Sequence, residues 1–95
     1  MQALHLPSWV DSSKDKSIRK VLRLRYILIT LALHHSERGS MRSFATRVGL
    51  AHNTLSHYIR LGSFSPTAAA QIEKALGQKV IKAEYLIDPL SMPKK

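Results

Sequence analysis

Apolar side chains recur every three or four residues over residues 40–62, which is the period of an amphipathic helix. The first part of this segment predicts a helix over Met41–Val48. Ser40 is its expected N-cap, because a serine oxygen can accept a hydrogen bond from a backbone N–H of the first turn. Gly49 follows the helix, and glycine adopts the positive φ of a sharp turn at little cost. The residues expected to face inward on this helix are Met41, Phe44, Ala45 and Val48.

A second short helix is predicted over residues 51–61, and its two sides differ in chemistry. Leu55, Tyr58 and Ile59 share one side and are expected to pack inward. The opposite side carries imidazole, amide, hydroxyl and guanidinium groups and no carboxylate. These are the groups that read base edges in a DNA major groove. The residues expected to contact base edges are His52, Asn53, Ser56, His57 and Arg60.

The spacing of Ala45, Gly49, Leu55 and Ser56 resembles the helix-turn-helix of bacteriophage repressors of the Cro/CI type. The resemblance implies a lambda-repressor-like, all-α domain of four to five helices. In that family the first helix of the motif crosses the DNA backbone and the second enters the major groove. The resemblance also implies transcriptional regulation, with repression as the expected mode. The residues expected to contact DNA phosphates are Arg38, Arg42, Arg47 and Thr54.

A long basic helix is predicted before this motif. Ser12 or Ser13 can cap it, and the helical pattern continues to about residue 36. Residues 26–33 are apolar almost all round and include β-branched side chains, so a strand is the alternative there, although the pattern on both sides favours a helix. The basic half is either a solvated face or a set of additional phosphate contacts. The residues considered for those contacts are Arg19, Lys20 and Arg23.

The two ends of the chain are expected to lie outside the helix-turn-helix domain, which is predicted over residues 13–90. Residues 1–12 form an N-terminal arm that is either frayed or docked through Trp9, since a lone tryptophan is more often a packing anchor than a ligand contact. Residues 91–95 are expected to form a loose basic tail.

Capping signals predict one further helix after the motif. Ser65 can cap a helix over Pro66–Leu76, because proline is favoured at the first helical position, and Gly77 is suited to its end. Ala83–Ile87 is expected to form one more helical turn. The order of residues 77–90, GQKVIKAEYLIDPL, resembles the end of the small prophage regulators called YdaS-like.

Charge indicates the class of partner. The 95-residue chain has 15 Lys and Arg against 6 Asp and Glu, a formal net charge of +9, which implies an anionic partner. Double-stranded DNA is the expected one, whereas a membrane surface would require residues 14–33 to lie on it as a basic amphipathic helix. The longest apolar run is too short to span a bilayer and no secretory leader is recognised. A cytoplasmic, nucleoid-associated protein without membrane attachment is expected.

The sequence lacks the residue patterns that catalysis and metal binding usually require. It contains no cysteine, no HExxH motif and no glycine-rich phosphate loop, and its acidic residues are scattered. His52 and His57 are five positions apart, not the four that place two ligands on one metal ion. No enzymatic activity, cofactor or metal is therefore expected.

Two functions remain open at this level. One is a sequence-specific regulator that binds a two-fold operator as a homodimer, because a single short helix reads only a few base pairs. The alternative is a protein-interaction module, such as the antitoxin of a toxin–antitoxin pair, that binds a protein partner through the long first helix. The operator and the dimer surface have no recognisable sequence pattern.

Overall fold

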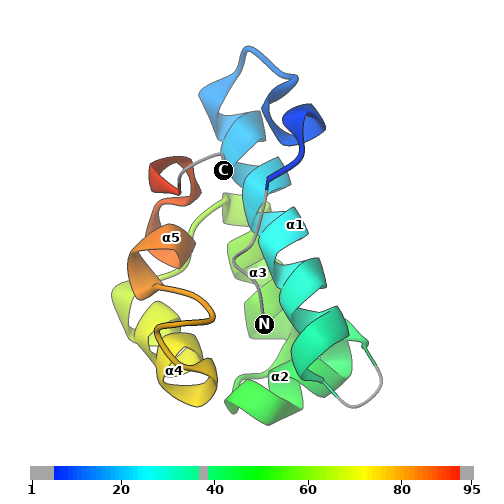
Figure 1. Cartoon of the computed structure of the whole chain (residues 1–95), viewed down its shortest axis with the longest axis vertical. Coiled ribbons are helices and arrows are strands. Elements are labelled where there is room, and N and C mark those ends of the chain that lie inside the picture. The colour runs from blue at the N-terminus through cyan, green and yellow to red at the C-terminus, as the bar shows by residue number, and fades with distance from the viewer. Residues whose placement is uncertain (1–5, 37–38, 93–95) are drawn as a thin grey trace.

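Helices make up most of the computed structural model, which describes residues 6–36 and 39–92 (Figure 1). Of the described residues, 72% lie in helices and none lies in a strand, so the predicted all-α class is confirmed. In chain order the segments are the 3₁₀ helix η1 (Ser8–Asp11), α1 (Lys16–His35), α2 (Met41–Val48), α3 (His52–Leu61), α4 (Pro66–Leu76), α5 (Ala83–Ile87) and the 3₁₀ helix η2 (Pro89–Ser91).

The long helix α1 runs along one side of the molecule, and α4 and α5 occupy the other side (Figure 1). α2 and α3 both pack against α1 and against each other, and α4 packs against α2 and α5. Each α-helix contributes at least one fully buried side chain to a single core, which explains why short helices are stable here. The largest of these side chains are Leu24, Ile27, Leu28 and Leu31 of α1, Phe44 of α2, Leu55 of α3, Ile72 of α4 and Leu86 of α5.

The first helix begins later than predicted, because its N-cap is Asp15 and not Ser12 or Ser13. The Oδ1 atom of Asp15 accepts a hydrogen bond of 2.8 Å from the backbone N–H of Ser17. The apolar stretch over residues 26–33 is helical throughout, so the helix is confirmed there and the strand alternative is wrong.

Local capping signals predicted the other helix ends well. The Oγ atom of Ser40 accepts a hydrogen bond of 3.1 Å from the N–H of Ser43 at the start of α2. Ser65 caps α4 in the same way, through the N–H of Ala68 at 3.2 Å. α4 ends at Gly77 as expected, and the bounds of α2, α4 and α5 agree with the predicted ones. These ends depend on residues three or four positions apart, which the sequence displays directly.

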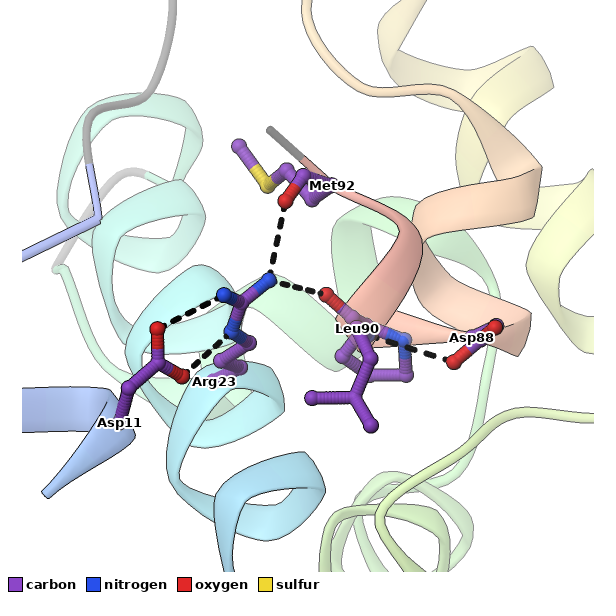
Figure 2. Close-up of polar contacts among 6 residues, drawn as sticks. Asp11, Arg23, Asp88, Leu90 and Met92 are labelled. Atoms are coloured by element: carbon purple, nitrogen blue, oxygen red, sulfur yellow. Dashed lines mark hydrogen bonds and ion pairs between the residues drawn. The ribbon is translucent and has the colours of Figure 1, made fainter. Parts of the chain in front are cut away.

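One arginine of α1 is buried and joins the two ends of the described chain (Figure 2). The Nε and Nη2 atoms of Arg23 each donate to the carboxylate of Asp11 at 2.8 Å. Its Nη1 atom donates to the carbonyl oxygens of Pro89, at 3.0 Å, and Met92, at 2.9 Å. The hydrogen bonds to Asp11 raise the pKa of Arg23 against the opposing effect of burial, so the arginine stays charged.

The described parts of the predicted arm and tail pack on α1 through η1 and η2, whereas residues 1–5 of the arm lie outside the described residues. Val10 is fully buried, and Trp9 is docked on Tyr26 edge-to-face, with ring centroids 5.9 Å apart, although it stays 51% exposed. Met92 is buried at the other end of the chain. Residues 93–95 of the predicted tail lie outside the described residues. The helical domain therefore includes η1 and η2.

Candidate nucleic-acid interface

Residues 49–51 connect α2 to α3 by a tight turn. Gly49 has φ 78° and ψ 26°, the left-handed conformation that glycine adopts without steric cost. Its N–H donates to the carbonyl oxygen of Thr46 at 3.2 Å, and the N–H of Leu50 donates to that of Ala45 at 3.0 Å. This pair of bonds closes the end of α2 and sets the direction in which α3 leaves.

A side chain from α4 holds this turn in place. The Nε2 atom of Gln71 donates to the carbonyl oxygens of Val48 and Gly49, both at 2.9 Å. A Cβ atom on Gly49 would lie 2.9 Å from the same nitrogen, so a larger residue there would displace the Gln71 amide from the turn. Sequence reasoning missed Gln71, because no local pattern links it to a turn 22 residues earlier.

α3 is anchored on its inner side and at its C-terminal end. Leu55 is fully buried, Ile59 is buried and Tyr58 is partly buried, as predicted. At its end Gly62, with φ 82°, approaches α1 so closely that a Cβ atom would lie 3.2 Å from the backbone nitrogen of Val21. These contacts fix the rotation of α3 about its axis and turn its polar side away from the core.

The predicted base-reading side chains lie on that outer side of α3. Asn53, His57 and Arg60 are exposed, and His52 and Ser56 are partly exposed. Within the part of the chain that the structure describes, none of the five makes a side-chain hydrogen bond or an ion pair. Their donors and acceptors can therefore be satisfied by a bound partner.

The predicted phosphate contacts lie on α2 and in the first turn of α3, apart from Arg38, which lies outside the described residues. Arg42 and Arg47 are exposed on α2, and Thr54 is partly exposed on α3. Burial lowers the pKa of His35 at the end of α1, and the positive charge of Arg47 lowers it further. Near neutral pH the positive charge at this place therefore comes from the arginine.

The basic half of α1 contributes less to this surface than predicted. The structure contradicts the prediction that Arg23 contacts DNA, because its guanidinium group is enclosed by Asp11 and two backbone carbonyl groups. Arg19 and Lys20 are partly exposed. The Nη2 atom of Arg19 donates to the carbonyl oxygen of Lys14 at 3.4 Å, which directs it toward the start of the helix.

Arg25 of α1 is a candidate residue that sequence reasoning missed. It is exposed and, among the described residues, makes no hydrogen bond or ion pair. It lines the same solvent-open hollow as Ser56 and Arg60 of α3, with a volume of ≈ 390 Å³. The residues that line this hollow are Arg25, Ile29, Met41, Ser56, Ile59 and Arg60. Only the packing of α1 on α3 brings these side chains together.

Three acidic side chains of the described residues are engaged away from this surface. Asp11 pairs with Arg23, Asp15 caps α1, and the carboxylate of Glu73 accepts a backbone N–H at the start of α5. α2 and α3 themselves contain no acidic residue. No carboxylate on α2 or α3 therefore neutralises the positive charge of the arginines on these helices, and this charge favours binding of a polyanion.

The described part of the chain gives little support for metal binding or for a membrane-spanning helix. No three metal-binding side chains lie close enough there to hold an ion. None of the helices described combines the length and apolarity needed to cross a bilayer.

No protein-family model matches the chain, and neither a curated protein nor a solved structure gives a match. Any function proposed for the chain therefore depends on the geometry and chemistry of this surface.

Proposed function

We propose that the chain is a sequence-specific double-stranded DNA-binding protein in which α2 and α3 act as a helix-turn-helix. One observation supports this most strongly. The unbonded polar side chains on the outer side of α3 lie next to a helix with two exposed arginines, and neither helix carries a carboxylate. A major groove admits a helix with such a face, since every base pair presents donors and acceptors there.

The proposed roles follow from side-chain chemistry. The Asn53 amide can form two hydrogen bonds to adenine, and Arg60 can reach a guanine or a phosphate. Arg42, Arg47 and Thr54 hold the backbone, which positions the protein and supplies affinity without selectivity. The remaining base-edge contacts are assigned to His52, Ser56 and His57.

We further propose that the protein binds as a homodimer and acts as a regulator at a two-fold operator. α3 has 10 residues and reads only a few base pairs, so two half-sites about 10 base pairs apart supply the missing specificity. The resemblance to Cro/CI-type repressors and YdaS-like prophage regulators motivates repression as the mode. In this role the protein works in the cytoplasm, at the nucleoid.

Selection of binding sites from a pool of random duplex DNA tests this proposal directly. The expected result is an enriched, palindromic motif. The double variant Asn53→Ala, Arg60→Ala should lose the enrichment, whereas Lys74→Ala, an exposed change on α4, should return the same motif. Failure to enrich any motif, or the same motif from the double variant, would overturn the assignment.

A second candidate function is protein interaction through α1, and it is favoured by exposed apolar residues. Ile29 and Leu33 are 46% and 64% exposed on this helix. An antitoxin-like protein would use such a surface to hold a partner. Light scattering combined with a DNA-binding assay separates the two functions, since a stable heteromer with no affinity for duplex DNA would favour interaction alone.

A further inference from the structure

Four apolar residues lie along one side of α1 and define a surface that we term the α1 strip: Ile18, Leu22, Ile29 and Leu33. Separations of four, seven and four positions place side chains on the same side of a helix. Ile18, Ile29 and Leu33 are each about half exposed or more, and Leu22 is partly buried. The strip extends over roughly 22 Å, at about 1.5 Å per residue. Exposed apolar side chains grouped on one side of a helix point to an interaction surface, whereas apolar residues scattered singly do not.

The hollow between α1, α2 and α3 continues this strip and adds charge to it. Ile29 belongs to both, and Met41 and Ile59 extend the apolar surface onto α2 and α3. Arg25 on α1 and Arg60 on α3 line the hollow, and neither has an acidic partner among the described residues. α1 and α3 pack side by side, so one partner can reach both arginines (Figure 1).

Charge decides which occupant suits this surface. Arg25 lies near the middle of the α1 strip, so symmetric pairing of two strips, parallel or antiparallel, would oppose two arginines. A partner with carboxylates beside an apolar stripe would instead pair with both guanidinium groups. The length of the strip fits a helix laid along it.

We propose that the α1 strip and the hollow bind an acidic amphipathic helix of another protein. The apolar stripe of that helix covers Ile18, Ile29 and Leu33, and its carboxylates pair with Arg25 and Arg60. The same helix then covers Ser56 and Arg60, which are proposed DNA contacts, and thereby excludes DNA from α3. This last step rests on the proposed DNA-binding function, whereas the docking itself does not.

A designed peptide provides the probe. It has about 18 residues, roughly 27 Å as a helix, with leucines spaced to match the α1 strip and glutamates on both flanks. Titration into the full chain at about 0.15 M salt, followed by amide NMR, should give saturable shifts confined to residues 18–33, Met41 and residues 56–60. A peptide of the same composition in scrambled order and one with lysines for glutamates should both bind at least about tenfold more weakly.

Matched variants locate the site. Ile29→Asp and Arg25→Glu, both at exposed positions, should weaken peptide binding about tenfold or more. Lys74→Glu makes the same charge change on α4 and should alter it less than about twofold. Equal binding of the scrambled peptide, equal effects of Arg25→Glu and Lys74→Glu, or no saturable binding would overturn the proposal. A dimer of the free chain that Ile29→Asp dissociates would also overturn it, because the occupant would then be a second copy.

Competition with DNA is measured separately. The peptide should displace a duplex selected by the protein, and a stable complex of protein, peptide and duplex would refute the exclusion step. If no duplex binds at all while the peptide still does, the proposed DNA-binding function fails and the docking surface stands. The two failures are therefore distinguishable.

Discussion

Arg23 differs from the other basic residues of α1 because its side chain is only 8% exposed and all of its bonding partners lie in distant segments. A buried charge is tolerated when it is paired and hydrogen-bonded, and strongly destabilising when its partner is removed. Arg23 meets this condition through Asp11 at one end of the chain and through two carbonyl groups at the other (Figure 2). It therefore acts in stability and not in binding.

We expect Arg23→Met to reduce the free energy of unfolding by about 3–5 kcal/mol, because the hydrogen bonds from the buried guanidinium group to the Asp11 carboxylate and to two carbonyl groups are lost together. Urea unfolding followed by circular dichroism measures this loss. Arg25→Met, two positions along the same helix but exposed, should change stability by less than about 0.5 kcal/mol. Similar losses from the two variants would show that Arg23 does not hold the chain ends.

Asn53 and Arg47 should separate selectivity from affinity. Asn53→Ala is expected to cost about 1–3 kcal/mol on the selected duplex and to relax the preference at one base pair. Arg47→Ala should weaken all duplexes alike and reduce the slope of log K against log salt by about one. Dissociation constants for the selected duplex and a shuffled one, measured at several salt concentrations, give both quantities. Equal weakening of the two duplexes by both variants would contradict the assigned roles.

At the scale of elements, the orientation of α3 depends on how closely its C-terminal end approaches α1. Gly62 combines a left-handed φ of 82° with the lack of a side chain that would meet Lys20 and Val21. Gly39 also has a positive φ, 67°, but a Cβ atom there would meet only ordinary contacts, the nearest at 3.4 Å from a Leu33 side-chain carbon. Substitutions at Gly39 and Gly62 therefore separate the effect of a positive φ, which both share, from the effect of close packing, which only Gly62 has.

Both Gly62→Ala and Gly39→Ala should therefore lose about 1–2 kcal/mol from the positive φ. Gly62→Ala should lose roughly a further 1–3 kcal/mol, because the added methyl group pushes α3 away from α1. Thermal or urea unfolding of both variants tests this difference. If Gly62→Ala is no worse than Gly39→Ala, the contact between these helices is not as tight as the geometry indicates.

At the scale of the whole molecule, the formal net charge of +9 opposes folding and favours binding to DNA. Like charges repel in the folded chain, so salt should raise its thermal midpoint by screening them. Salt also competes for the phosphates of DNA, so it should weaken duplex binding. Only one ion pair is found among the described residues, and it is buried, so screening should remove little favourable pairing.

We expect the thermal midpoint of the free chain to rise between about 50 and 200 mM salt, while duplex affinity falls by about a thousandfold if a dimer contacts about six phosphates. Circular dichroism melting and fluorescence anisotropy measure the two quantities in the same buffers. A fall of the midpoint over this range would show that exposed ion pairs matter more than repulsion. Salt-independent affinity would contradict phosphate contacts.

The sequence by itself determined the helical class, most helix ends and the polar side of α3. Ser40, Ser65 and Gly49 act through hydrogen bonds to residues three or four positions away, so their roles are visible in a local pattern. The same holds for the inward face of α3, because helical periodicity alone groups Leu55 with Ile59. The start of α1 was the exception, since Asp15 and two serines compete for one cap.

Only the tertiary structure decided which basic residues are structural and which can meet a partner. Arg23 bonds to groups 12, 66 and 69 positions away, and Gln71 bonds to a turn more than 20 positions earlier. Arg25 joins Arg60 only because α1 packs on α3. These roles arise when distant segments meet around one core, and the local chemistry of an arginine or a glutamine is the same whichever segment it will meet.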